Sequence, residues 1–213
     1  MKCSDCSEIV RPIVAIDIDG TLGDYHRHFL NFAEGYLDTK LPRDWDGVGD
    51  WEEHLGLTKE KYREVKLAYR QGGLKRTMPS FFGVESFTHT LKEHGAEIWI
   101  TTTRPWLRLD NIDPDTREWI RRNRIAYDHM IYGKDKYSQL ASLVSPERVV
   151  AVVDDLEVEC EKAAAEFGEA VVFQMANDFN RGARGRFTTV TSPMSALGLI
   201  VARIERWKER YGD

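Results

Sequence analysis

Residues 12–22 read Pro-Ile-Val-Ala-Ile-Asp-Ile-Asp-Gly-Thr-Leu, and this stretch decides the fold. The apolar, β-branched run that begins at Pro12 is typical of a strand buried on both faces of a sheet. Two carboxylates, Asp17 and Asp19, stand at the end of that strand, and Gly20 follows them. A buried charge is costly without compensation, so these carboxylates imply a nearby cation or metal ion. The stretch therefore predicts a buried strand that ends in a charged site.

Further runs of the same kind follow along the chain, with helical patterns between them. We expect strands at 97–102, 129–132, 148–153 and 170–173. Start and stop signals predict helices that run from Val84 to Gly95, that open at Asp113-Pro114, that cover 156–167, and that begin at Ser192-Pro193. Strands that alternate with helices indicate an α/β fold, here a Rossmann-like core with a mostly parallel sheet.

One segment interrupts this alternation. About eighty residues separate the first two expected strands, far more than one crossover helix needs. Aromatic and apolar residues at helical spacing predict two amphipathic helices there, with Tyr25, Phe29, Phe32 and Tyr36 in the first and Tyr62, Val65 and Tyr69 in the second. Between them, residues 41–56 are rich in Asp, Gly and Trp, as is typical of a loop. We therefore expect residues 24–80 to form an inserted helical cap, and residues 1–23 and 81–213 to form the core.

Composition excludes several classes of protein. The 213 residues are 42% hydrophobic and carry a net charge of −5, which argues against a disordered chain and against a general nucleic-acid coat. Three cysteines suit a reducing compartment, and Cys3 and Cys6 make half of a zinc site at most. The apolar stretch at 194–202 is shorter than the ~20 residues of a membrane span. We expect a cytoplasmic protein with no membrane partner.

Three other strand ends carry chemical groups. Asp154 and Asp155 end the run at 148–153, Thr101, Thr102, Thr103 and Arg104 end the run at 97–102, and Lys134 and Lys136 follow the run at 129–132. In a parallel sheet the carboxyl ends of the strands meet at one edge, so these side chains are expected to converge there. Carboxylates suit Mg²⁺, whereas hydroxyl groups and cations suit an anion. Together they are typical of phosphoryl transfer.

These motifs resemble those of the haloacid dehalogenase superfamily of aspartate-nucleophile phosphatases. The four segments DIDGTL, ITTTRP, KDK and VVDD resemble its four motifs, in the family's order, over residues 17–155. The resemblance implies that Asp17 attacks phosphorus and that Asp19 serves as general acid and base. It also implies that Asp154 and Asp155 complete an Mg²⁺ site with the Asp17 carboxylate and the Asp19 backbone carbonyl.

The same resemblance implies two further catalytic residues but leaves a choice for each. Thr102 would hold a phosphoryl oxygen, because Thr-x-Arg-Pro is the commoner arrangement in the family, and Thr101 is the alternative. Lys136 would neutralise charge between the nucleophile and the phosphoryl group, and Lys134 is the alternative.

The substrate has to be inferred from the cap and the loops beside it. Trp45 and Trp51 stand in the polar loop, where a ring is free to stack on a nucleobase. The long insertion and these rings resemble the 5′(3′)-deoxyribonucleotidases of the superfamily. This resemblance implies that the substrates are (deoxy)nucleoside monophosphates, with Trp45, Trp51, Thr103 and Arg104 as substrate-binding residues.

Two other functions are open from the sequence. Arg104, followed by Thr116 and Trp119, resembles the pattern of the polynucleotide 3′-phosphatase of phage polynucleotide kinases. A basic band at 104–124 and a basic loop at 181–186 could then follow a nucleic-acid 3′ end. No GxxxxGK[ST] loop of a kinase is present. The third possibility is a non-catalytic protein that binds a nucleotide or another protein.

Overall fold

A computed structural model describes residues 10–45, 49–105, 108–180 and 187–211. In this part of the chain, six parallel strands form one sheet in the order β3-β2-β1-β4-β5-β6. The strands are β1 (Ile13–Ile16), β2 (Glu97–Thr102), β3 (His129–Tyr132), β4 (Val149–Asp154), β5 (Val172–Met175) and β6 (Thr188–Val190). The predicted α/β fold with a parallel sheet is confirmed.

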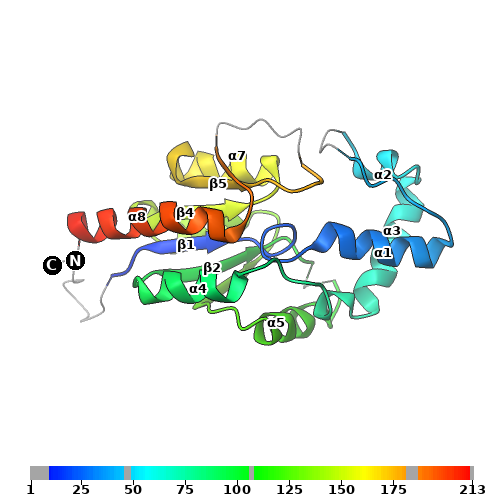
Figure 1. Ribbon diagram of the computed structural model, residues 1–213, viewed down its shortest axis with the longest axis horizontal. Helices are drawn as coiled ribbons and strands as arrows, with labels where there is room; N and C mark the ends of the chain where they lie inside the picture. Colours follow the sequence, from blue (N-terminus) through cyan, green and yellow to red (C-terminus); the bar gives the residue numbers. More distant parts are fainter. Residues whose placement is uncertain (1–9, 46–48, 106–107, 181–186, 212–213) are drawn as a thin grey trace.

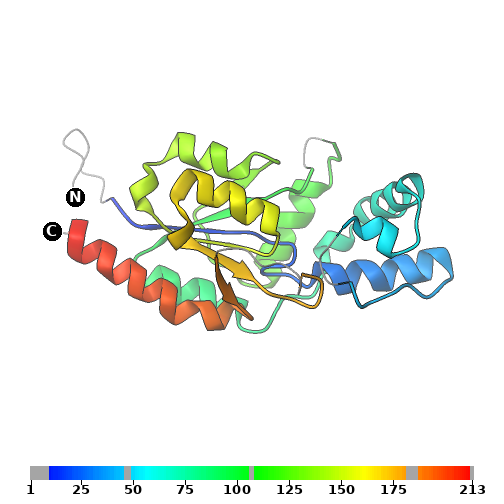
Figure 2. The ribbon, with the colours of Figure 1, turned by 90° about the horizontal axis from the view of Figure 1, so that it is seen from above.

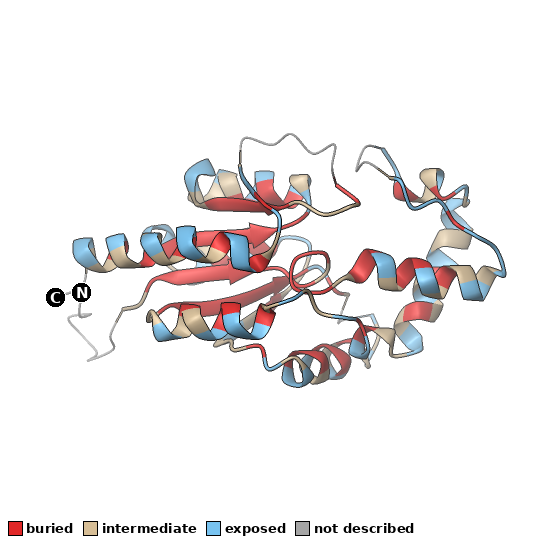
Figure 3. Ribbon diagram, in the orientation of Figure 1, coloured by how far each residue is buried: buried red, intermediate tan, exposed pale blue. Residues whose placement is uncertain are grey.

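Helices cover both faces of the sheet (Figures 1 and 2). On one face α4 (Val84–Glu93), α5 (Ile112–Arg122) and α8 (Pro193–Tyr211) contribute to the same core as Val14 and Ile16. On the other face α6 (Lys136–Leu143) and α7 (Glu157–Phe167) pack with Ile13 and Ala15. Successive residues of a strand point to opposite faces, and therefore β1 has to be apolar throughout. Figure 3 shows the sheet as a buried layer between exposed helix surfaces.

The helices of the inserted segment lie beyond the carboxyl ends of the strands (Figure 1). They are α1 (Tyr25–Leu37), α2 (Trp51–His54), α3 (Lys59–Gln71) and the 3₁₀ turn η1 (Leu74–Arg76), and we call them the cap helices. Aromatic rings hold them together: the ring centroid of Phe29 lies 5.5 Å from that of Tyr69 and 5.4 Å from that of Trp51. The domain bounds at 24 and 80 stay a prediction.

The two connections to the cap helices run side by side. A bridge joins Gly23 to Ser80, and the backbone N–H of Asp24 donates to the carbonyl of Pro79 at 2.8 Å. These contacts tie the entry and exit of the inserted segment together just beyond β1. Consequently, the charged end of β1 lies where the core meets the cap helices.

Several expected details were wrong. Helix α5 begins at Ile112, and Asp113, expected as its N-cap, instead accepts hydrogen bonds from Arg117 and Tyr132. Helix α2 occupies part of the expected loop at 41–56. Helix α6 and strand β6 were not expected at all, since both are short. No helix in the described ranges has the length and apolar character that a membrane crossing requires.

Candidate active site

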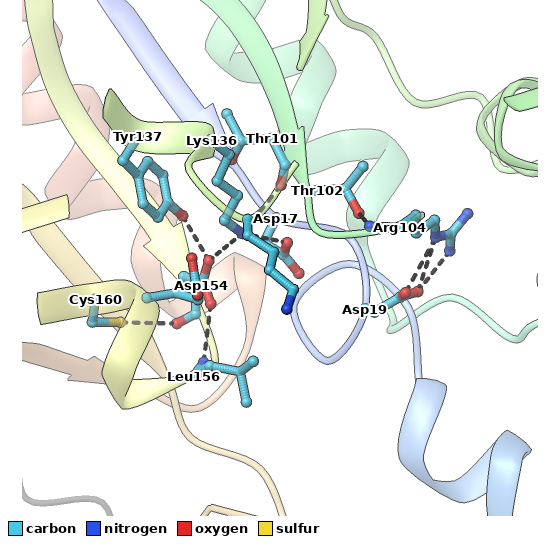
Figure 4. Close-up of polar contacts among 12 residues, drawn as sticks. Asp17, Asp19, Thr101, Thr102, Arg104, Lys136, Tyr137, Asp154, Leu156 and Cys160 are labelled. Atoms are coloured by element: carbon cyan, nitrogen blue, oxygen red, sulfur yellow. Dashed lines mark hydrogen bonds and ion pairs between the residues drawn. The ribbon is translucent and has the colours of Figure 1, made fainter. Parts of the chain in front are cut away.

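The ammonium group of Lys136 joins two buried carboxylates at the centre of the site. Its Nζ donates to Asp17 Oδ1 and to Asp154 Oδ2, each at 2.6 Å, and all three side chains are buried (Figure 4). Lys136 is the first residue of α6, which directs it under the ends of β1 and β4. Although burial opposes it, Asp154 and Asp17 raise the pKa of Lys136 well above its ordinary value. Lys134 is exposed, so the structure brings Lys136 and not Lys134 to the nucleophile candidate.

Three carboxylates form a cluster that fits a metal ion. Oxygens of Asp17, Asp154 and Asp155 all lie within 4.8 Å of one another, and the three residues are buried. The Oδ1 atom of Asp155 is buried and has no hydrogen-bond partner within the described residues, as expected of an oxygen reserved for a cation. Burial, Asp154 and Asp17 together raise the pKa of Asp155 well above its ordinary value. A hard, oxygen-only donor set of this kind fits Mg²⁺.

Gly20 leaves room for this cluster. A Cβ atom at this position would lie 2.0 Å from Asp155 Oδ2, and the backbone φ of +98° is one that side chains disfavour. Glycine is thus needed at position 20 for two reasons: the turn requires a positive φ, and the Asp155 carboxylate packs where a side chain would begin.

The side chain of Asp19 points away from the cluster and toward two cations. Arg104 Nη2 donates to Asp19 Oδ1 at 2.6 Å, and Lys75 Nζ, from η1, donates to Asp19 Oδ2 at 2.5 Å. Lys75 also lies 3.7 Å from the ring centroid of Tyr25. The Asp19 carboxylate therefore joins the core to the cap helices, while its side chain contributes nothing to the metal cluster.

Burial and charge give the two motif carboxylates opposite protonation preferences. Burial raises the pKa of Asp17 to about 7, with Lys136 opposing and Asp154 adding to the rise. Although burial opposes it, Arg104 and Lys75 hold the pKa of Asp19 well below its ordinary value. Burial also lowers the pKa of Lys75 to about 7, with Asp19 opposing and Arg104 adding. Asp17 therefore takes up a proton more readily than Asp19 does.

The two threonines at the end of β2 have different surroundings. Thr102 Oγ1 accepts a hydrogen bond from the backbone N–H of Arg104 at 3.3 Å, which shapes the turn after the strand. Thr101 Oγ1 is buried without a partner within the described residues, and the Thr101 carbonyl accepts from Lys136 at 3.4 Å. Both side chains are buried, whereas Thr103 is exposed at the cavity described next.

A cavity of about 210 Å³ opens between the strand ends and the cap helices. Its described lining includes two carboxylates, Asp17 and Asp19, and five cations, which are Lys66, Arg70, Lys75, Arg104 and Lys136. The excess of positive charge suits an anionic ligand. The cavity is also lined by the rings of Tyr25, His26, Trp45, Trp51 and Tyr62.

Solved structures of known proteins share this architecture. A Clostridium acetobutylicum protein described as a predicted phosphatase is 14% identical, with a TM-score of 0.63 over 91% of this chain and 100% of its own. A Bacteroides fragilis hydrolase described as haloacid dehalogenase-like is 16% identical, with a TM-score of 0.61 over 85% and 97%. CbbY from Rhodobacter sphaeroides, solved in complex with phosphate, is 16% identical, with a TM-score of 0.58 over 87% and 96%.

The chain shares the fold of these proteins, one of which is described as haloacid dehalogenase-like. At this level of identity the comparison concerns the fold alone. No protein-family model and no curated protein matches the sequence.

Within this haloacid dehalogenase-like fold, the expectation that both tryptophans lie in a polar loop is wrong for Trp51. Trp51 is the first residue of α2 and is buried among Tyr25, His26 and Phe29. Trp45 is half-buried and stacks on Trp51, with 6.0 Å between ring centroids. Trp51 is thus a core residue whose edge reaches the cavity, and Trp45 is the more exposed ring of the two.

The basic band at 104–124 is largely neutralised. Arg104 is buried and donates to Thr116 Oγ1 at 2.9 Å in addition to Asp19. On the surface, Arg117 pairs with Asp113, Arg121 with Glu118, and Arg124 with Glu85. Trp119, part of the polynucleotide phosphatase pattern, is fully buried and so has no surface for a base. The basic loop at 181–186, like Cys3 and Cys6, lies outside the described residues.

Four residues of the site were missed from the sequence. Lys66, Arg70 and Lys75 come from the cap helices, and Tyr137 donates to Asp154 Oδ2 at 2.6 Å. Only the spacing of Lys66 and Arg70, one helical turn apart on α3, could have indicated that they share a face.

Proposed function

We propose that this protein is a metal-dependent phosphomonoesterase that works through an aspartyl-phosphate on Asp17. The observation that carries the proposal is the Lys136 ammonium placed 2.6 Å from both Asp17 and Asp154, at a cavity rich in cations. A lysine in this position offsets the repulsion between an attacking carboxylate and an anionic phosphoryl group. The haloacid dehalogenase-like fold, shared with phosphatases, supports the same reaction class.

The metal would be held by Asp17, Asp154 and Asp155, because the unpartnered Asp155 oxygen and the clustered carboxylates fit a divalent cation. When bound, Mg²⁺ supplies the positive charge that polarises the phosphoryl group and keeps nearby carboxylates ionised. We propose Mg²⁺ as the ion because oxygen donors alone make up the cluster.

In the proposed reaction, a carboxylate oxygen of Asp17 forms a bond to phosphorus while the bond from phosphorus to the leaving oxygen breaks. The leaving oxygen takes a proton from Asp19 and departs as an alcohol. Asp19 then takes a proton from water, whose oxygen attacks phosphorus and breaks the bond to Asp17. The products are an alcohol and inorganic phosphate.

The cations around Asp19 control its protonation state during the proposed reaction. Arg104 and Lys75 hold Asp19 ionised before substrate arrives, which is the wrong state for an acid. An incoming phosphoryl group competes for the same two cations and weakens their hold on the carboxylate. Loss of that hold raises the pKa of Asp19 toward its ordinary value and beyond it, since the carboxyl is partly buried.

We further propose that the substrates are small (deoxy)nucleoside monophosphates. The aromatic wall of the cavity supports this proposal, with the half-buried Trp45 as the ring on which a base would stack. Arg104 and the exposed Thr103 would contact the phosphate and sugar side of the ligand. An oligonucleotide 3′ end is the alternative, and it requires the polymer to pass between the cap helices and the core.

One experiment tests the proposed chemistry. Purified protein with Mg²⁺ is assayed for phosphate release from para-nitrophenyl phosphate, a panel of deoxynucleoside monophosphates and a 3′-phosphorylated oligonucleotide. Asp17→Asn is expected to lower kcat by at least a thousandfold without loss of fold, whereas Asp110→Asn, on an exposed carboxylate, is the matched control. Substantial Mg²⁺-dependent turnover by Asp17→Asn would refute the aspartyl-phosphate.

The same assay separates the substrates. Release from mononucleotides supports the nucleotidase, and release mainly from the oligonucleotide supports the 3′-phosphatase. No release from any phosphoester favours a non-catalytic binding protein. Trp45→Ala is expected to raise KM for nucleotides severalfold more than KM for para-nitrophenyl phosphate, and equal effects would remove the stacking role.

A further inference from the structure

Two cations of α3 line the active-site cavity, and neither is ion-paired to a carboxylate among the described residues. Lys66 and Arg70 both line the cavity and stand one helical turn apart. Lys66 Nζ donates to the neutral hydroxyl of Tyr62 at 3.0 Å. Within the described ranges, the buried Nε atom of Arg70 has no hydrogen-bond partner, and no carboxylate forms an ion pair with either side chain.

This arrangement places two positive charges side by side on one helix, where an anion would reduce their mutual repulsion. Like charges one turn apart on a helix repel each other, and burial strengthens the repulsion. Burial lowers the pKa of Lys66 to about 8, with Arg70 adding to the fall and the carboxylates of Glu52 and Asp19 opposing it. Two other lysines of α3 do have carboxylate partners. Lys61 pairs with Glu64 at 2.9 Å, and Lys59 pairs with Asp50 at 3.4 Å.

The proposed reaction does not use these two cations. Lys136 serves the nucleophile, while Arg104 and Lys75 hold Asp19. Lys66 and Arg70 line the cavity from α3, a cap helix that contributes Val65 and Tyr69 to the hydrophobic core. Because other cations already serve Asp17 and Asp19, these two are available to a different part of the ligand.

We propose that Lys66 and Arg70 form a subsite for a second anionic group of the substrate, which makes the preferred substrate a phosphomonoester that carries a further phosphate. For a nucleotide, this chemistry is that of a nucleoside 3′,5′-bisphosphate, or of a phosphodiester next to a terminal 3′-phosphate. The proposal rests on the proposed phosphatase function and adds the substrate class to it. Arg70 suits a phosphate because its guanidinium presents several donors in one plane.

The test compares kcat/KM for 2′-deoxyadenosine 3′,5′-bisphosphate with that for the 5′- and 3′-monophosphates. We expect the wild-type protein to prefer the bisphosphate at least tenfold. Lys66→Met and Arg70→Met, singly and together, are expected to reduce that preference at least tenfold, through KM rather than kcat. Arg63→Met, an exposed cation of the same helix, is the matched control and should retain the preference.

Equal losses for mono- and bisphosphate in the Lys66 and Arg70 variants would overturn the proposal, as would a wild-type protein with no preference. A 3′-phosphorylated trinucleotide identifies the source of the second charge. If it is a better substrate than the bisphosphate, and still depends on Lys66 and Arg70, the subsite holds a phosphodiester.

A failure of the anion subsite can be distinguished from a failure of the proposed phosphatase function. If no phosphoester is turned over, the phosphatase proposal fails, and binding of the bisphosphate is then measured by calorimetry in wild type and in the double variant. Binding that is at least tenfold weaker in the double variant supports the anion subsite without catalysis. Equal binding, or none, overturns it.

Discussion

Replacement of Lys136 by methionine isolates the contribution of one buried ammonium to both stability and catalysis. The side chain is 1% exposed and donates to Asp17 and Asp154 at 2.6 Å each. Methionine fills a similar volume, so the main loss is charge and not packing. Removal of one partner from a buried ion pair costs about 3–5 kcal/mol, because the remaining carboxylate charge is left uncompensated.

The magnitude converts to a measurable shift. For a protein of this size, 1 kcal/mol corresponds to roughly 2–4 °C in Tm, so Lys136→Met should lower Tm in EDTA by roughly 6–20 °C. Mg²⁺ should restore part of the loss, since a cation bound to the same carboxylates replaces some of the missing charge. With para-nitrophenyl phosphate, kcat should fall by about 10²–10³, as for removal of a donor that stabilises transition-state charge.

The chain provides its own control for this experiment. Lys134 precedes Lys136 by two residues and is exposed, so Lys134→Met should change the free energy of unfolding by less than about 0.5 kcal/mol. Thermal unfolding with and without Mg²⁺, together with the phosphate-release assay, measures both effects. If Lys136→Met and Lys134→Met unfold at the same temperature in EDTA, the lysine does not compensate the buried carboxylates and the assignment fails.

Two further predictions concern the metal cluster. The Gly20→Ala variant should lose most of its Mg²⁺-dependent activity, because the new Cβ atom would displace Asp155. Gly168 is the control, since it has a similar φ and open space around it. Gly168→Ala should lower the free energy of unfolding, measured with denaturant, by roughly 1–3 kcal/mol through backbone strain alone. Without Mg²⁺, the native pKa of Asp17 is about 7, whereas in the unfolded chain it is about 4. Between these pH values the native state therefore holds more of this proton than the unfolded state does. As a result, the contribution of Asp17 to stability falls as the pH rises from about 4 to 7. Mg²⁺ binds the ionised form, and the Tm increase that it produces should therefore be larger at pH 7 than at pH 5. An increase of the same size at both pH values would contradict this.

The core of the site could be predicted because the topology of the sheet determines which residues meet there. Strand ends of a parallel sheet meet at one edge, so Asp17, Asp154 and Lys136 were expected together although they are far apart in sequence. The choice between Lys134 and Lys136 needed the structure, since it depends on where α6 begins. Likewise, the protonation preferences of Asp17 and Asp19 depend on burial and on partners that no motif includes.

The cap side of the site could not be predicted for a different reason. Lys75 reaches Asp19 across 56 positions of sequence, and neither its neighbours nor its spacing signals that contact. Trp51 was expected in a loop because Asp and Gly surround it, yet a short helix and the aromatic core bury it. Side chains of the cap helices acquire their environment from packing against the core, and local sequence carries little of that information.

The distribution of charge links these two halves of the site. The core contributes the carboxylates Asp17, Asp154 and Asp155, while α3 and η1 contribute Lys66, Arg70 and Lys75. Of these three cations, Lys75 alone is ion-paired to a core carboxylate, Asp19, within the described part of the chain, and in the proposed reaction an incoming phosphate would compete for that contact. Substrate binding would therefore exchange a bond between the core and the cap helices for bonds from both to the ligand. A nucleotide with two phosphates would make the larger gain, since it occupies the place of Asp19 beside Lys75 and also supplies the counter-charge that Lys66 and Arg70 lack.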